Sequence, residues 1–220
     1  ELCALAAASA AFLADHFLGR YVALELVALA LPLALLARRS NQATAQQARA
    51  CYLLLRLGDA GLLTSIVILA LHGGTLKITT ALEAGRSLGA TRLSWAVGGF
   101  ILATWVKLGG WPFHLWSLPA GALGLPARGW LYAVVVPNLG AYLLYRVTPL
   151  LRLTGPWQEG VIWGGALGAA VAALLALERR GSHAAIPLAL SAQGGLLLFL
   201  AAAGLKSSIW LALLVMAPLR

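Results

Sequence analysis

Long runs of apolar residues alternate with short polar or glycine-rich connectors along the whole chain. A helix needs about 20 residues to cross the hydrocarbon core of a bilayer, and by that measure about seven or eight of the runs could each span a membrane. They cover residues 2–17, 21–37, 50–71, 93–107, 129–151, 161–177, 184–205 and 209–219. The pattern therefore predicts an all-α fold, a polytopic bundle of transmembrane helices in a single membrane domain.

The connectors between these runs differ in character. Residues 40–49 are rich in Gln and predict a polar connector, whereas residues 79–88 favour a short helix at the membrane surface. Residues 108–128 are apolar but contain several glycines and prolines, which predicts irregular backbone after the run that ends near residue 107.

The segment from Lys107 to Pro119 predicts a discontinuous helix. Lys107 lies at the end of an apolar run, and Gly109, Gly110, Pro112 and Pro119 follow it as helix breakers. An ionisable side chain in hydrocarbon is costly, so its presence favours a functional role. Broken helices at membrane depth occur where protein or a water-filled cavity lines them. We therefore expect this segment to lie near a path for protons or cations.

Composition supports a membrane protein and excludes a nucleic-acid-binding one. The chain is 61% hydrophobic and only 10% charged, whereas soluble domains carry about 25% charged residues. The net charge of +9 comes from 16 Lys and Arg that lie singly or in pairs, mostly at the ends of apolar runs. Such positions suit contact with lipid headgroups. The sequence has no haem, zinc, nucleotide or iron–sulfur motif, so we expect no cofactor, no metal and no catalytic site of its own.

The basic residues divide almost evenly between the two ends of the predicted helices. Six lie at one end and seven at the other, which gives no orientation under the positive-inside rule. The first set is Arg38, Arg39, Arg49, Arg128, Arg179 and Arg180, and the second is Arg20, Lys77, Arg86, Arg92, Arg146, Arg152 and Lys206.

Three charged residues besides Lys107 are candidates for a role in the membrane. Glu25 is in the middle of the 21–37 run, where its carboxylate either has a functional role or pairs with a neighbouring helix. Arg56 and Asp59 are three residues apart and share one helix face, so they can neutralise each other as a structural pair. Gly58 and Gly61 allow another helix to approach closely, so Asp59 can also reach Glu25 or Lys107.

Lys107 and His114 are the candidates for proton transfer. A lysine held between desolvation and a nearby carboxylate can gain or lose a proton as its partner moves. The alternative is a lysine whose side chain extends to the membrane interface. His114 can pass protons between Lys107 and water, or hydrogen-bond a free carbonyl at the broken turn. Asn138 and Gln193 are secondary polar residues in later spans, where interhelical hydrogen bonds explain them equally well.

Four sequence elements together resemble one family, the antiporter-like membrane subunits of respiratory complex I, multisubunit cation/proton antiporters and inorganic-carbon-accumulating complexes. Leu-Glu-Leu at residues 24–26 resembles the glutamate span of that family, and residues 56–61 resemble its Arg-x-Gly-Asp-x-Gly element. Residues 107–119 resemble its lysine and Pro-x-His block, and residues 142–149 resemble its Tyr-Leu-x-x-Arg-x-x-Pro helix end.

The resemblance implies that Glu25 and Lys107 form the charged pair of a proton half-channel. It also implies that residues 2–151 form a first antiporter-like repeat and residues 160–220 the start of a second. One departure is that the family usually has a histidine early in the helix after the break, where this chain has Tyr132.

Two functional hypotheses follow. The first is a proton-conducting subunit of a larger complex in a bacterial inner membrane, with other membrane and peripheral subunits, lipid and protons as partners. Phe113 and Ala192 lean slightly towards the inorganic-carbon relatives within this hypothesis. The second is a shortened scaffold or docking subunit that transports no ion, which the single repeat and Tyr132 favour.

Overall fold

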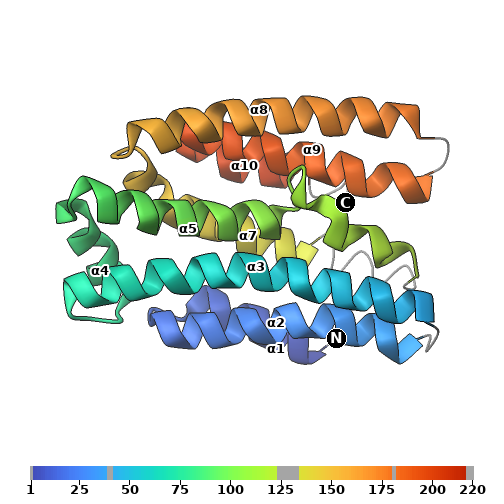
Figure 1. The fold of residues 1–220 in the computed structure, drawn as a ribbon, viewed down its shortest axis with the longest axis horizontal. Helices are drawn as coiled ribbons and strands as arrows, with labels where there is room; N and C mark the ends of the chain where they lie inside the picture. Colours follow the sequence, from blue (N-terminus) through green and yellow to red (C-terminus); the bar gives the residue numbers. More distant parts are fainter. Residues whose placement is uncertain (1, 39–41, 123–133, 180–181, 217–220) are drawn as a thin grey trace.

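The computed structural model describes residues 2–38, 42–122, 134–179 and 182–216, and within these ranges it contains helices and no strand (Figure 1). The helices are α1 (Leu2–Leu13), α2 (Phe17–Arg38), α3 (Gln42–Gly73), α4 (Ile78–Ala84), η1 (Gly85–Ser87), α5 (Ala90–Leu108), η2 (Phe113–Ala122), α7 (Val136–Leu151), α8 (Gly155–Glu178), α9 (Ser182–Ala202) and α10 (Lys206–Met216). The predicted all-α bundle is confirmed.

The long helices run roughly parallel or antiparallel to one another along the longest axis of the molecule (Figure 1). Helix α3 packs between α2 and α5, and α7 contacts α5 from another side, while α8 and α9 form an antiparallel pair along one edge. By length and composition four of the described helices can cross a membrane, namely those with spans Phe17–Ala37, Thr44–Gly73, Gly155–Glu178 and Ala185–Ala202.

Glycines bring neighbouring helices into close contact at two crossings. A Cβ atom on Gly61 of α3 would lie 2.8 Å from the carbonyl oxygen of Gly99 on α5. A Cβ atom on Gly165 of α8 would likewise lie 2.8 Å from the carbonyl oxygen of Gly195 on α9. Inside a membrane the hydrophobic effect does not drive helices together. Small residues at a crossing let the two backbones approach closely and gain van der Waals contact instead. The abundant glycine of the sequence thus serves helix packing.

Several predicted boundaries need correction. The segment 40–49 is mostly helical, because α3 begins at Gln42 and its Gln, Ala and Arg residues are good helix formers. The surface helix predicted at 79–88 is present as α4 followed by η1. Pro137 is at the start of α7. Arg39, Arg128, Tyr132 and Arg180 lie outside the described residues, as do positions 129–133 and 217–219 of the predicted spans.

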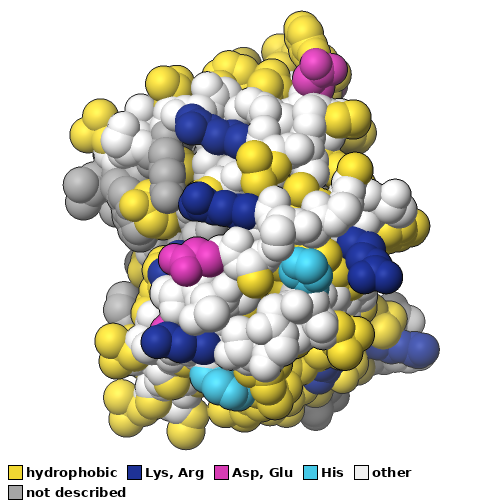
Figure 2. All heavy atoms as spheres, turned by 90° about the vertical axis from the view of Figure 1, so that its left-hand side faces the viewer, with side chains coloured by type: hydrophobic (Ala, Val, Ile, Leu, Met, Phe, Trp, Pro, Cys, Tyr) yellow, Lys and Arg dark blue, Asp and Glu magenta, His cyan; other side chains and the backbone are white. Residues whose placement is uncertain are grey.

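One end of the bundle carries exposed basic side chains. Helix α4 lies across one end, where α3 and α7 finish and α5 and α8 begin. Figure 2 shows this end, on which basic side chains are interspersed with acidic and histidine side chains. Lys77, Arg86, Arg92 and Arg152 have exposed side chains there, as the predicted division of basic residues requires.

Candidate functional site

Lys107 lies in the last turn of α5, directly before the break that the sequence predicted. Gly109 ends the helix in the left-handed conformation, with φ of 66°, and its N–H bonds to the carbonyl of Val106 at 3.0 Å. A residue with no Cβ adopts this conformation without strain. Pro119 follows within η2, a 3₁₀ helix. Four residues lie between the end of α5 at Leu108 and the start of η2 at Phe113.

Two tryptophans satisfy carbonyl groups at the broken end. The Trp116 indole N–H donates to the carbonyl of Val106 at 2.6 Å, and the Trp105 indole N–H donates to that of Trp111 at 3.0 Å. The last carbonyls of a helix have no N–H partner within it, and a buried carbonyl without a partner is costly. These two bonds remove that cost at the end of α5. They hold the end of α5 in place around Lys107.

The Lys107 side chain is buried, with 3% of its surface exposed, so it does not extend to an interface. A Cβ atom on Gly140 of α7 would lie 3.0 Å from the Lys107 Cβ atom, and one on Gly194 of α9 would lie 2.7 Å from the carbonyl oxygen of Leu108. Two glycines from two other helices thus pack directly on the end of α5. Asn138 and Gln193, the secondary polar candidates, are close in sequence to these glycines, on the same two helices.

Lys107 forms a buried ion pair with Asp59 of α3. The Lys107 Nζ atom is 2.6 Å from Asp59 Oδ1, and the side chains are 3% and 1% exposed. The second carboxylate oxygen, Oδ2, is also buried and has no hydrogen-bond partner in the described part of the chain. Removal of either partner of a buried ion pair is costly, because it leaves the other charge buried without a counter-charge.

A second ion pair joins Glu25 of α2 to Arg56 of α3. Its side chains are 12% and 35% exposed, so this pair is nearer the surface than the first. Arg56 also donates from Nε to the Tyr52 hydroxyl at 3.0 Å, and its guanidinium lies 5.1 Å from the centre of the Tyr52 ring. Tyr21, one turn before Glu25, interacts with the Glu25 carboxylate.

The two ion pairs belong to one electrostatic cluster across α2, α3 and α5. Arg56 and Asp59 share a face of α3, and Asp59 acts electrostatically on Arg56 and on Tyr21. The sequence analysis considered a pair between Glu25 and Lys107, mutual neutralisation of Arg56 and Asp59, and contact of Asp59 with Glu25 or Lys107. The structure instead pairs each residue of α3 with a different neighbouring helix, because α3 lies between α2 and α5. Of the pairings considered, that of Asp59 with Lys107 is present.

His114 is buried but is not bonded to the cluster. Its imidazole interacts with the backbone of Pro112, which is the contact that the second interpretation of this residue expected. The Nδ1 atom is buried without a hydrogen-bond partner among the described residues, and no hydrogen bond joins His114 to Lys107. Ser117 donates from its hydroxyl to the His114 carbonyl at 2.7 Å.

Tyr21 and Tyr52 are site residues that the sequence analysis missed. Each precedes its charged partner by four residues, Tyr21 before Glu25 and Tyr52 before Arg56. Residues at this spacing lie on the same face of a helix. A tyrosine one turn before an intramembrane charge was therefore a detectable signal.

Comparison with known proteins assigns the chain to a family. The profile of the family described as "NADH:quinone oxidoreductase/Mrp antiporter, TM" matches residues 14–217. The chain belongs to this family. As a member of the NADH:quinone oxidoreductase/Mrp antiporter family, with long apolar helices, it is an integral membrane protein.

Individual relatives agree with this assignment. The chain is 29% identical over 168 residues to NADH-quinone oxidoreductase subunit L of Campylobacter jejuni, which covers 76% of this chain and 28% of that protein. It is 30% identical over 171 residues to NADH-quinone oxidoreductase subunit N of Paraburkholderia phymatum, covering 76% of this chain and 35% of the relative. The chain thus spans about a third or less of the length of these two relatives.

A solved structure shares the fold. The Mrp complex from Dietzia sp. DQ12-45-1b contains a chain that superposes with a TM-score of 0.81 at 22% sequence identity. The match covers 89% of this chain and 22% of that one. At this level of identity the likeness concerns the fold, and it extends over nearly all of the bundle described above.

Proposed function

We propose that this chain is a proton-conducting antiporter-like subunit of a larger membrane complex, in which Glu25, Arg56, Asp59 and Lys107 form the transfer path. The observation that carries the proposal is the pair of ion pairs linked through one face of α3. Ionisable residues inside membrane proteins are expensive, and groups of them mark ion pathways and proton relays.

The chemistry of the four side chains assigns them different tasks. Arginine keeps its proton under all ordinary conditions, so Arg56 acts as a movable positive charge and carries no proton. If its guanidinium turns from Glu25 to Asp59, the Asp59 carboxylate no longer needs the Lys107 ammonium. Lys107 then releases a proton to water, while Glu25, now without a counter-charge, takes one up. Return of Arg56 to Glu25 reverses both changes.

Two features support this exchange. Arg56 is partly exposed and is held by Tyr52 rather than fixed among several carboxylates, which leaves its guanidinium able to turn. The Oδ2 atom of Asp59 has no partner among the described residues, so this carboxylate has an acceptor ready for a second donor. His114, with its Nδ1 atom also available, is proposed as the next proton carrier beyond the break.

The proposed setting follows from the relatives. Their names place them in NADH-quinone oxidoreductase, and the solved neighbour is an Mrp complex. We propose other membrane and peripheral subunits, lipid and protons as partners, in the inner membrane of a bacterium. Residues 2–151 are proposed as one antiporter-like repeat and residues 160–220 as the start of the next. The lean towards inorganic-carbon systems from Phe113 and Ala192 stays a prediction.

The test is to replace Lys107 by Met in the intact complex and measure proton movement in sealed membrane vesicles. We expect driven proton flux to be lost while the complex still assembles. Lys77→Met is the matched control, because Lys77 is exposed beside α4 and makes no ion pair among the described residues. Flux that survives Lys107→Met unchanged would contradict the proposal.

A structural role is the second candidate, favoured by the observation that the same two ion pairs join three helices. A scaffold subunit predicts that Lys107→Met leaves proton flux unchanged. It predicts instead that Arg56→Gln and Asp59→Asn reduce assembly of the complex. Assembly and flux measured on the same vesicles therefore separate the two functions.

A further inference from the structure

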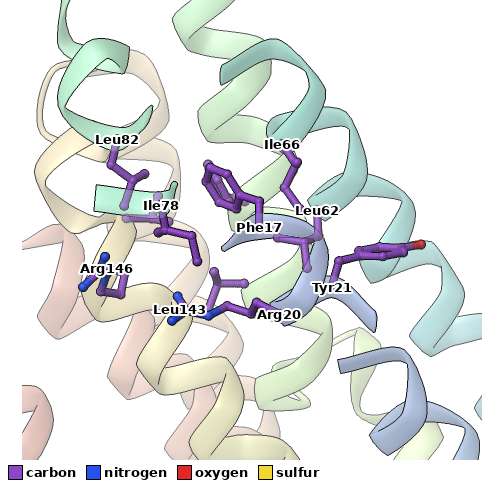
Figure 3. A pocket seen from close by; sticks show the side chains of 11 residues that line it. Phe17, Arg20, Tyr21, Leu62, Ile66, Ile78, Leu82, Leu143 and Arg146 are labelled. Atoms are coloured by element: carbon purple, nitrogen blue, oxygen red, sulfur yellow. The ribbon is translucent and has the colours of Figure 1, made fainter. Parts of the chain in front are cut away.

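A layer of apolar side chains separates the ion pairs from the charged end of the bundle that bears α4. The layer surrounds a cavity of about 10 Å³, shown in Figure 3. This value is the volume open to the centre of a water molecule, and a cavity needs about 10–15 Å³ of it to hold one water. The space therefore accommodates a single water at most, which is too little for a continuous chain of waters.

The layer lies closer to the charged end than the ion pairs on three helices of the bundle. On α2 it contains Phe17, two turns before Glu25, and on α3 it contains Leu62 and Ile66, one and two turns beyond Asp59. On α5 it contains Phe100, seven residues from Lys107. At 1.5 Å per residue these offsets correspond to roughly 5–12 Å along the helix axes.

Helix α7 completes the layer from the other side. Leu143 and Val147 line the cavity, one and two turns beyond Gly140, the glycine that packs on Lys107. On each of the four helices the lining residues lie on the α4 side of the ion-pair cluster or of Gly140, so the layer extends across the bundle. It therefore lies between the buried cluster and the surface of Figure 2.

The apolar side chains are tightly packed. Phe17 and Phe100 stack with ring centres 6.5 Å apart and an interplanar angle of 28°. These two side chains and those of Leu62 and Ile66 are all at most 3% exposed. Arg20, Tyr21 and Arg146 also line the cavity, but its small volume leaves no room for a chain of waters. A narrow, mostly apolar constriction without such a chain blocks ion passage in membrane channels.

Arg20 adds a fixed positive charge to the wall of the same cavity. Its Nε atom donates to the carbonyl of Ala11 at 2.9 Å, and Nη2 donates to that of Ala14 and to the Tyr142 hydroxyl, the latter at 3.2 Å. Its side chain is 6% exposed and makes no ion pair among the described residues. Asp15 acts on it electrostatically, but that carboxylate is 45% exposed and lies 4.0 Å from Arg146.

We propose that this layer and Arg20 together form a proton barrier between the Glu25–Lys107 cluster and the α4 end of the bundle. The apolar side chains exclude a chain of waters, and the guanidinium repels any cation that enters, as arginine does in selective water pores. The inference rests on the proposed function, because a barrier matters only if protons reach the cluster. It adds Phe17, Arg20, Leu62, Ile66 and Phe100, which belong to neither the ion pairs nor the family motifs.

The test measures passive proton leak in vesicles that contain the intact complex, with an imposed pH difference and no energy source. Phe100→Ala and Leu62→Ala each remove a side chain from the layer. We expect either change to raise the leak about tenfold, which corresponds to about 1.4 kcal/mol off the barrier. Leu31→Ala is the matched control, since Leu31 is buried in α2 and does not line the cavity.

Each variant is then combined with Lys107→Met to separate the barrier from the relay. A leak that disappears in the double variant supports both the barrier and the proposed path. A leak that persists supports the barrier and contradicts the role of Lys107. No leak in Leu62→Ala, or an equal leak in Leu31→Ala, overturns the barrier whatever the flux assay gives. If Phe100→Ala does not assemble, Leu62→Ala decides alone.

Discussion

Asp59 and Lys107, 48 residues apart in the chain, meet at 2.6 Å in the interior of the bundle. Both side chains are almost fully removed from the surface, and each comes from a different helix. The contact converts two residues that would each be costly in hydrocarbon into one neutral unit. It also lies directly beside the helix break that follows Leu108.

The first prediction concerns the coupling of this pair. Asp59→Asn leaves the Lys107 ammonium buried without a counter-charge, and we expect a loss of about 3–5 kcal/mol in stability. Adding Lys107→Met removes the uncompensated charge and should restore most of that loss. Thermal unfolding of the purified complex carrying each single change and both together measures the coupling. Additive effects of the two changes would show that the pair is not formed.

A second prediction concerns the tyrosine that holds Arg56. Tyr52→Phe removes the hydroxyl that accepts from Arg56 Nε and keeps the ring beneath the guanidinium. Because Arg56 is partly exposed, we expect only about 1 kcal/mol of lost stability. Driven proton flux should fall more clearly, since the guanidinium loses its defined position. Tyr145→Phe on α7, outside the ion-pair cluster, is the control, and an equal drop in flux there would contradict the role of Tyr52.

The fold was largely predictable from the sequence, because hydrophobic length alone specifies membrane helices. Each of the eight predicted apolar runs corresponds to a helix in the described residues, but only four of the described helices are long and apolar enough to cross a membrane. Gly109 ends α5 at the expected break. Pro119 lies inside η2, because a missing N–H removes one hydrogen bond without necessarily ending a short 3₁₀ helix. Local composition therefore located the elements better than it located their ends.

The site was predictable in its members and in the contact of Asp59 with Lys107, but not in the pairing of Glu25 with Arg56. Glu25, Arg56, Asp59 and Lys107 stand out because charge is rare in apolar runs. Which carboxylate meets which cation depends on the order of helices in space, and α3 lies between α2 and α5. The apolar layer around Phe100 was invisible in the sequence, because its residues are ordinary apolar residues of transmembrane helices.

A third prediction uses two glycines in opposite surroundings. Gly140→Ala places a methyl group 3.0 Å from the Lys107 Cβ atom, so α5 and α7 must separate. We expect a loss of about 1–3 kcal/mol in stability, as overpacked sites show, and reduced proton flux because Lys107 moves relative to Asp59. Gly19→Ala is the control, since nothing lies within 4 Å of its added Cβ. Flux unaffected by Gly140→Ala would show that the position of Lys107 is not critical.

The last prediction separates the charge of Arg56 from its shape. Arg56→Lys keeps a positive charge on α3 but loses the planar fork and the Nε donor that binds Tyr52. Arg56→Gln loses the charge as well and leaves Glu25 without its counter-ion. If Arg56 alternates between Glu25 and Asp59, driven proton flux should fall in the order wild type, Arg56→Lys, Arg56→Gln, with assembly preserved at least in the lysine variant. Equal flux in all three, measured in vesicles with matched amounts of complex, would rule out the exchange. Loss of assembly in both variants would instead assign the Glu25–Arg56 pair to helix packing, and the path would then have to begin at Asp59.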